Sequence, residues 1–151
     1  MKAPVIDGLN GLLADGTVLY QKLRHYHWNV EGPHFFELHV KFEELYTRWA
    51  VTNDELAERV RTIGGTPLHT LKAVLHVATL EEDPAIPEPH EMVARLAADL
   101  RAIHERAGVV LGEAEDAGDR GTANLLDALR DALEKDVWML RAWGEEVSAW
   151  T

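Results

Sequence analysis

Apolar residues recur at three- and four-residue steps along most of the chain, which is the spacing of one face of an α-helix. The first such segment carries the apolar positions Val5, Leu9, Leu12, Leu13, Leu19, Leu23 and Tyr26. A second runs over residues 34–63, a third over 91–116 and a fourth over 122–150. No segment shows the period-two alternation of a strand, and no internal repeat is evident. The pattern therefore predicts four long helices.

Glycine and proline separate these helices. Gly32-Pro33 follows the first, and Gly64-Gly65-Thr66-Pro67 ends the second, with glycine as the C-cap and proline preventing continuation. Residues 68–80 predict a short connecting helix, and 81–90, with three prolines, predict an extended linker. Residues 118–121 form the last turn. This order of elements predicts an all-α, ferritin-like four-helix bundle with a long crossover that carries a short extra helix between the second and third long helices.

The length of 151 residues fits one domain, so residues 1–151 are expected to form a single unit. Cysteine is absent, which excludes disulfides, thiolate catalysis and cysteine-ligated zinc or iron–sulfur sites. No stretch is apolar over the roughly 18 to 20 residues that a membrane helix needs. The N-terminal segment contains aspartate and glycine where a secretory signal would be apolar. We therefore expect a cytoplasmic protein with no membrane segment.

Acidic residues outnumber basic ones, since 26 Asp and Glu against 15 Lys and Arg give a formal net charge of −11. Nucleic-acid binding needs a basic surface, whereas an acidic chain attracts cations. Lys2 is the only basic residue before the first helix, and the chain ends at Trp150-Thr151, so neither end supplies a basic tail. We expect no appreciable DNA affinity at physiological ionic strength.

Histidine and carboxylate residues are spaced for metal binding on the predicted second helix. His39 and Glu43 lie four residues apart, as do Asp54 and Glu58, so each pair shares a helix face. Two carboxylates placed in this way repel each other unless a cation lies between them. Mixed imidazole and carboxylate donors suit iron, manganese or zinc.

The length of this helix decides how the two pairs can combine. His39 and Asp54 are separated by about 22 Å on a continuous helix, whereas metal–ligand bonds are only about 2 Å long. One ion therefore cannot bridge them within one chain. Their angular offset is only about 60°, so an antiparallel copy of the helix would bring His39 of one chain near Asp54 and Glu58 of the other. The spacing favours a site shared between two subunits.

Each residue also has a simpler interpretation. Asp54 and Glu58 fit a solvated face on which Glu58 pairs with Arg59 or Arg61. The histidines fit ordinary surface or interface positions. The inward Glu-x-x-His pattern of an ordinary ferritin site has one match, Glu31 to His34, and this match falls on the Gly-Pro break.

Taken together, these residues resemble the Dps (DNA-protection-during-starvation) family of mini-ferritins over nearly the whole chain. The matching motifs are His27-Trp28-Asn29-Val30-Glu31-Gly32-Pro33, Phe36-Glu37-Leu38-His39, Ala57-Glu58-Arg59, Gly64-Gly65-Thr66-Pro67 and Glu134-Lys135-Asp136-Val137-Trp138-Met139. The resemblance implies a hollow dodecamer built from two-fold dimers, with ferroxidase sites at the dimer interfaces. His27 and His39 of one chain, with Asp54 and Glu58 of its partner, would bind the iron.

The reaction that the resemblance implies is oxidation of Fe(II), by hydrogen peroxide in preference to dioxygen. Ferric mineral is then deposited in the cavity, which protects against oxidative stress. Zinc and manganese are competing ions for the same donors. Glu43 matches a position beside the family's site that is often Asp, and is a further candidate ligand or base. Trp28 and Trp138 match aromatic positions that take up an oxidising equivalent, although core or interface packing accounts equally well for Trp138.

Two further expectations concern ion access and alternative functions. Glu115, Asp116 and Asp119 are candidates for a carboxylate-lined pore, although Arg120 adds a positive charge and Asn124 stands where relatives often have Asp. A solvated acidic turn explains them equally well. The alternative functions are a DNA-binding, nucleoid-compacting protein whose iron chemistry is secondary, and a purely structural cage with degenerate metal sites.

Overall fold

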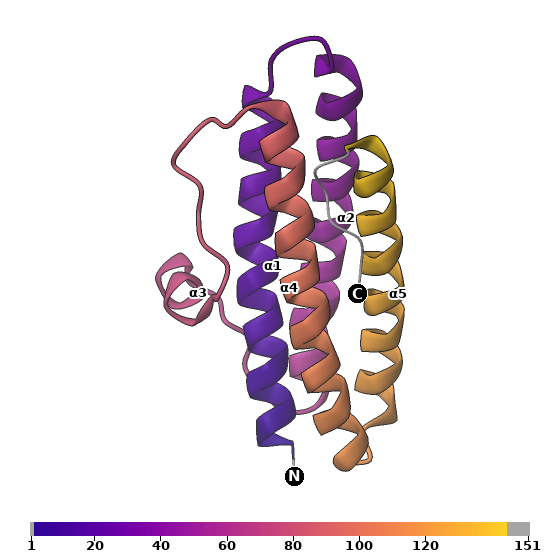
Figure 1. Ribbon diagram of the computed structural model, residues 1–151. Helices are drawn as coiled ribbons and strands as arrows, with labels where there is room; N and C mark the ends of the chain where they lie inside the picture. The colour runs from indigo at the N-terminus through magenta and orange to yellow at the C-terminus, as the bar shows by residue number, and fades with distance from the viewer. Residues whose placement is uncertain (1, 145–151) are drawn as a thin grey trace.

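The computed structural model describes residues 2–144, and within this range the chain is helical and contains no strand. Four long helices form a bundle, and a short helix lies beside the first of them (Figure 1). The helices are α1 (Ala3–Asn29), α2 (Phe35–Thr62), α3 (Leu71–Val77), α4 (Pro89–Asp116) and α5 (Arg120–Trp143). Figure 1 shows α1 and α5 running in one direction and α2 and α4 in the other. The predicted all-α, ferritin-like bundle with one long crossover is confirmed.

The apolar stripes of the long helices meet in one core. α1 packs against α2 and α4, and α4 packs against α5. Every apolar position predicted for the first helix is buried. The largest fully buried side chains are Tyr26, Phe42, Leu9, Leu12, Leu19, Leu23, Leu45, Leu56, Met92, Leu96, Leu100 and Ile103. Between residues 2 and 144, no helix combines the length and apolar character needed to span a membrane.

Glycine ends α2 and α4, as the sequence predicts for α2. Gly64 and Gly118 have φ values of +94° and +68°, in the left-handed region that favours glycine. The N–H of the next residue then bonds back to a carbonyl five residues earlier, from Gly65 to Val60 and from Asp119 to Ala114. This is the Schellman pattern, which satisfies carbonyl groups left free at a helix end.

Two helices begin earlier than the sequence pattern predicts. α4 begins at Pro89, inside the segment 81–90 that we assigned to the extended linker, because proline is favoured in the first turn of a helix. α5 begins at Arg120 rather than at residue 122. The Asp119 side chain caps this helix by accepting the backbone N–H of Thr122 at 3.1 Å.

The ends of the other predicted elements also differ. The connecting helix is shorter than the predicted 68–80, because Thr70 caps it at its start by accepting the N–H of Ala73. The predicted fourth helix continues to residue 150, whereas α5 ends at Trp143 with Gly144 as its C-cap. Residues 145–150 of that prediction lie outside the described residues.

A buried carboxylate on α1 holds the crossover against the bundle. Asp15 is 1% exposed and accepts four hydrogen bonds. The donors are the backbone N–H groups of Thr79 and Leu80, at 2.7 and 3.1 Å, and the Thr79 hydroxyl, at 2.9 Å. Arg106 on α4 completes the set with an ion pair at 2.7 Å. Because a buried charge must be fully paired, Asp15 fixes the crossover between α1 and α4.

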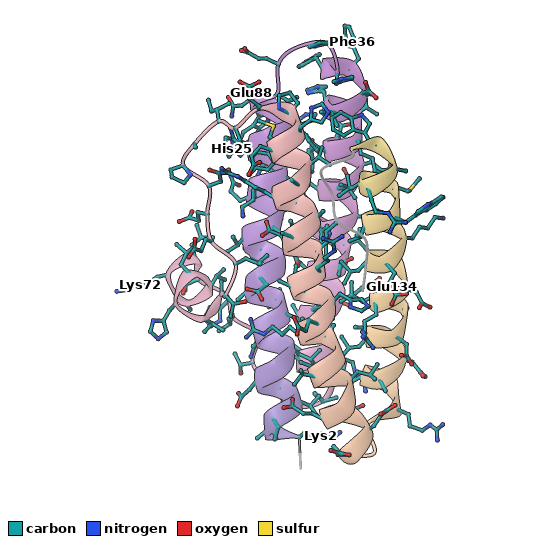
Figure 2. The ribbon with its side chains drawn as sticks, in the orientation of Figure 1. Lys2, His25, Phe36, Lys72, Glu88 and Glu134 are labelled. Carbon is teal, nitrogen blue, oxygen red and sulfur yellow. The ribbon has the colours of Figure 1, made fainter. Side chains whose placement is uncertain are left out.

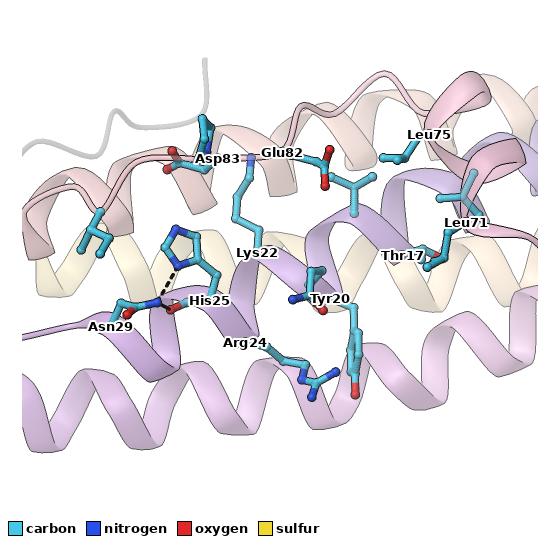
Figure 3. Close-up of a pocket in the computed structure, with 15 residues that line it drawn as sticks. Thr17, Tyr20, Lys22, Arg24, His25, Asn29, Leu71, Leu75, Glu82 and Asp83 are labelled. Carbon is cyan, nitrogen blue, oxygen red and sulfur yellow. Dashed lines mark hydrogen bonds between the residues drawn. The ribbon is translucent and has the colours of Figure 1, made fainter.

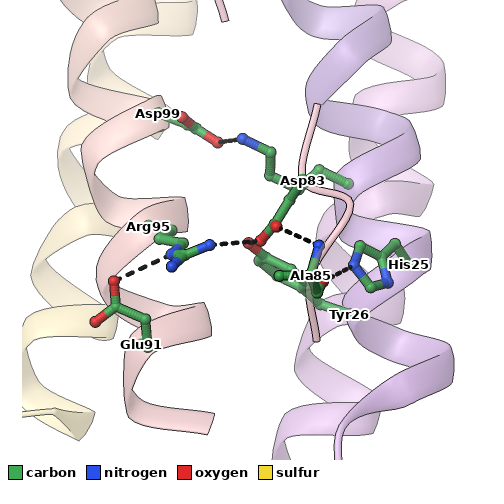
Figure 4. Close-up of polar contacts among 8 residues, drawn as sticks. His25, Tyr26, Asp83, Ala85, Glu91, Arg95 and Asp99 are labelled. Atoms are coloured by element: carbon green, nitrogen blue, oxygen red, sulfur yellow. Dashed lines mark hydrogen bonds and ion pairs between the residues drawn. The ribbon is translucent and has the colours of Figure 1, made fainter. Parts of the chain in front are cut away.

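A second carboxylate, Asp83, holds the crossover against the bundle close to the point where it enters α4 (Figure 4). It accepts the Tyr26 hydroxyl at 2.5 Å, the Ala85 N–H at 2.9 Å and Arg95 at 3.0 Å. Burial alone would raise the pKa of Asp83, but the hydrogen bonds from these three donors lower it. Ionised Asp83 therefore stabilises the folded protein. This stabilisation is fully present above the ordinary pKa of an aspartate and is lost as the pH falls through the lowered pKa of Asp83.

Replacing Asp15 should therefore destabilise the whole protein. In Asp15→Ala the Thr79 and Leu80 N–H groups and Arg106 lose a buried acceptor, and we expect the free energy of unfolding to fall by about 3 kcal/mol or more. Urea unfolding followed by circular dichroism measures the change. Asp7→Ala is the matched control, since Asp7 lies exposed on the same helix. A loss below about 1 kcal/mol in Asp15→Ala would contradict this role.

Candidate functional site

The turn between α1 and α2 brings His27 and His39 together. Their rings are stacked, with centroids 3.8 Å apart and an angle of 12° between the planes. Each Nδ1 lies 2.7 Å from the backbone carbonyl oxygen of the other histidine. Because a carbonyl oxygen only accepts, both Nδ1 atoms donate, and each neutral ring keeps its lone pair on Nε2. A histidine oriented in this way by a carbonyl is typical of metal ligands.

The local structure explains why these hydrogen bonds form. The His27 carbonyl lies in the last turn of α1, where the helix supplies no N–H partner, so the His39 ring takes that place. Phe35 stacks on the other side of His39 at 4.9 Å, and Tyr46 contacts His27 edge-on at 5.2 Å. Our sequence prediction missed both aromatic residues. Their positions four residues before and seven after His39, on the same helix face, are the signal that would have found them.

Glu43 lies one helical turn after His39. Its Oε1 is 3.7 Å from Nε2 of His27, which is too far for a hydrogen bond but within the range of an ion-pair contact. Its side chain is mostly exposed. The structure therefore places Glu43 with His27 and His39, and we call these three residues the histidine half-site.

Asp54 and Glu58 share an exposed face further along α2, and we call them the carboxylate half-site. A hydrogen bond with Asp54 and the negative charge of Asp54 raise the pKa of Glu58. Within the described residues no arginine compensates this pair. Arg59 bonds to Asp119 at 2.6 Å, and Arg61 donates to the Gly65 carbonyl. The alternative pairing of Glu58 with either arginine is therefore wrong.

The two half-sites do not meet within one protomer. α2 is continuous from Phe35 to Thr62, so His39 and Asp54 remain about 22 Å apart. Among residues 2–144 no three histidine or carboxylate side chains form a group that could hold a metal ion. One protomer thus carries two incomplete donor sets of complementary chemistry.

The tryptophan candidates lie at the protein surface. Trp28 is 56% exposed, and the Arg24 guanidinium lies 4.8 Å from its ring centroid. Trp138 on α5 is 54% exposed, which excludes packing in the core of the protomer as its role.

The pore candidates differ from one another. Glu115 and Asp116 are exposed at the end of α4. Asp119 is buried. Burial alone would raise its pKa, but hydrogen bonds from Thr122 and Arg59 lower it. Asp119 is therefore a helix cap and ion-pair partner rather than a solvated pore carboxylate.

A cavity of about 750 Å³ lies between α1, α3 and the crossover (Figure 3). Tyr20 and Arg24 line it from α1, Leu71 and Leu75 from α3, and Asp83 from the crossover. No member of either half-site lines it. The metal-binding chemistry and this cavity are therefore separate features.

Comparison with known proteins gives consistent matches. A family model described as a ferritin-like domain matches residues 6–149. A Brevibacillus brevis relative named DNA protection during starvation protein is 46% identical over 137 residues, covering 91% of this chain and 92% of the relative. A Bacillus anthracis relative, DNA protection during starvation protein 2, is 40% identical and covers 95% of this chain and 98% of the relative.

Solved structures agree with these sequence matches. A Dps protein from Bacillus brevis superimposes with a TM-score of 0.91 at 45% identity, covering 92% of this chain and 93% of that one. A Dps protein from Vibrio cholerae O1 gives 0.90 at 37% identity, covering 92% and 87%. The latter is described as a member of a broad superfamily of ferritin-like diiron-carboxylate proteins.

The carboxylate half-site makes a direct electrostatic prediction. Because Asp54 is the main cause of the raised pKa of Glu58, Asp54→Asn should return that pKa towards its ordinary value. Infrared titration of the protonated carboxyl band in metal-free protein measures the change. Glu55→Gln is the control, since Glu55 contributes the weakest of the causes that raise this pKa. An equal shift in both variants would show that Asp54 has no special role.

Proposed function

Since this chain belongs to the Dps family of ferritin-like proteins, we propose that it oxidises Fe(II) at sites shared between two subunits and stores the ferric product. The observation that carries this proposal is the pair of half-sites held apart along α2, with His27 joining the first of them from the end of α1. The histidine half-site offers neutral nitrogen donors, and the carboxylate half-site offers negative oxygen donors. Each set completes the other only when it comes from a second chain.

Charge explains why such a site would favour oxidation. Fe(III) carries one more positive charge than Fe(II), so the carboxylates of Asp54 and Glu58 stabilise the product more than the substrate. The Nε2 atoms of His27 and His39 hold the ion from the opposite side. Two Fe(II) ions supply the two electrons that convert one hydrogen peroxide and two protons into two water molecules. Zinc or manganese would compete because the same donors bind them.

Exposed apolar residues on α1, α3 and the crossover support a partner subunit on this side of the bundle. Trp28 beside the histidine half-site, Leu71 on α3 and Ile86 on the crossover are 56%, 75% and 65% exposed. Apolar surface of this kind typically marks an interface. We propose that two-fold dimers formed here assemble into a hollow dodecamer, in which mineral formation with peroxide or dioxygen as oxidant protects against oxidative stress. In this proposal Trp28, next to His27 in the sequence, takes up an oxidising equivalent.

Mixing two inactive variants tests the shared site. Fe(II) is added anaerobically, then hydrogen peroxide, and the ferric absorbance is followed. His39→Ala and Asp54→Ala should each lose most of the fast oxidation. After the two variants are unfolded and reassembled together, half of the dimers contain one chain of each kind, and each of these has one intact site. About a quarter of the wild-type oxidation should therefore return.

The controls separate oxidation from storage. Each variant reassembled alone should remain inactive, and circular dichroism should show that both fold. Wild-type rates in the separate variants would mean that the assigned ligands are wrong. No recovery on mixing would mean that each site lies within one chain. A particle no larger than a dimer would contradict storage even where oxidation survives.

DNA binding is not part of this proposal, although relatives carry DNA protection in their names. The net charge of −11 per chain repels phosphate, and assembly multiplies that charge. We expect no gel shift of duplex DNA at about 150 mM salt without divalent ions, where screening still leaves this repulsion effective. A retained complex under these conditions would support the nucleoid-compacting alternative instead.

A further inference from the structure

Three aromatic rings meet at the end of the bundle where the α1–α2 turn, the start of α4 and the end of α5 come together. They belong to His34, His90 and Trp143. The ring centroids lie 5.9 Å apart for the two histidines, and 5.1 and 4.8 Å from Trp143 to His34 and His90. Figure 2 labels Phe36 and Glu88, each two residues from one of these histidines, at this end of the molecule.

A carboxylate fixes the tautomer of His34. Its Nδ1 lies 2.8 Å from Oε1 of Glu37, and the other oxygen of Glu37 accepts Trp143 Nε1–H at 3.0 Å. These two hydrogen bonds, from His34 and then Trp143, lower the pKa of Glu37, so this carboxylate is charged and accepts. His34 Nδ1 therefore donates and its Nε2 carries the lone pair. A carboxylate behind an imidazole is the usual support for a metal-binding histidine.

The second imidazole is that of His90. Within residues 2–144, His90 takes part in ring contacts with His34 and Trp143 but in no hydrogen bond. It is exposed in the first turn of α4, so its ring can rotate without disturbing the core. Two imidazoles that bind one ion through bonds of about 2.0–2.1 Å, at angles of about 90 to 109°, place their ring centroids about 4.5 to 5.2 Å apart. The observed separation is 5.9 Å, so binding requires the exposed His90 ring to move towards His34 by roughly 1 Å.

We propose that His34 and His90 bind a divalent transition-metal ion, with Glu37 orienting His34 and water completing the coordination. This site shares no residue with either half-site, and it does not depend on iron oxidation. With two neutral nitrogen ligands it suits ions that favour imidazole, such as Cu²⁺, Ni²⁺, Co²⁺ and Zn²⁺, rather than Mg²⁺ or Ca²⁺.

The charges around His34 and His90 are compatible with a bound cation. His34 is the N-cap of α2 and His90 lies at the start of α4, where the positive ends of the helix dipoles oppose a metal ion. The carboxylate of Glu37 and the negative C-terminal end of α5 at Trp143 counter this effect. Glu88, the N-cap of α4, adds a further negative charge beside His90.

Two probes test the site in the intact, metal-free protein. Zn²⁺ binding measured by equilibrium dialysis should fall by one ion per chain in His90→Ala. His76→Ala is the matched control, because His76 is also exposed on a helix and lies outside the cluster. Cu²⁺ should quench the fluorescence of the adjacent Trp143, and this part of the quenching should be absent in Trp143→Phe and in His34→Ala.

The spectrum of bound Cu²⁺ identifies its ligands. In a His27→Ala and Asp54→Ala background, which removes donors from both half-sites, the electron paramagnetic resonance spectrum should show two nitrogen ligands, and one after His90→Ala. Unchanged Zn²⁺ stoichiometry in His90→Ala, or an equal loss in His76→Ala, would overturn the proposal. Failure of iron oxidation leaves these results unaffected, so the two proposals are tested separately.

Discussion

A carboxylate in the middle of α1 decides where the second half of the bundle lies. Asp15 is buried, so its charge must be satisfied, and its donors come from the crossover and from α4. Moving α4 away would leave the charge of Asp15 without Arg106, and moving the crossover would leave it without Thr79 and Leu80. Asp83, on the crossover close to the start of α4, is likewise bonded to both helices, through Tyr26 on α1 and Arg95 on α4. These bonds bring the chain back so that α4 runs parallel to α2.

The buried carboxylates hold segments of the chain together, whereas the straight α2 helix keeps the residues of the candidate site apart. A straight helix keeps its two donor pairs apart, however well the rest of the bundle packs. His27 joins His39 because α1 ends next to the start of α2, whereas Asp54 and Glu58 lie about four turns further on. Arg59, the neighbouring cation, is held by Asp119 at the start of α5. Arg59 therefore does not neutralise the negative charge of the carboxylate half-site.

The sequence predicts the helices well because apolar periodicity is a strong and local signal. The errors concern helix ends, where single residues decide, as Pro89 and Asp119 do by starting α4 and α5 early. For the candidate site, spacing along α2 predicts the separation of the two donor pairs. It could not show that His27 and His39 bond to each other's backbone, since that depends on the path of the turn between two helices. The role of Asp15 was equally hidden, because its partners lie more than 60 residues away.

The exchange of hydrogen bonds between His27 and His39 leaves each ring a single open nitrogen. Since both Nδ1 atoms donate to carbonyl oxygens, each neutral ring presents its lone pair at Nε2 only. The backbone of two helices therefore fixes which nitrogen atoms this half-site offers to a ligand. On the other half-site, the hydrogen bond with Asp54 and its negative charge raise the pKa of Glu58. Acidification therefore removes negative charge from the carboxylate half-site at a higher pH than it would from an isolated glutamate.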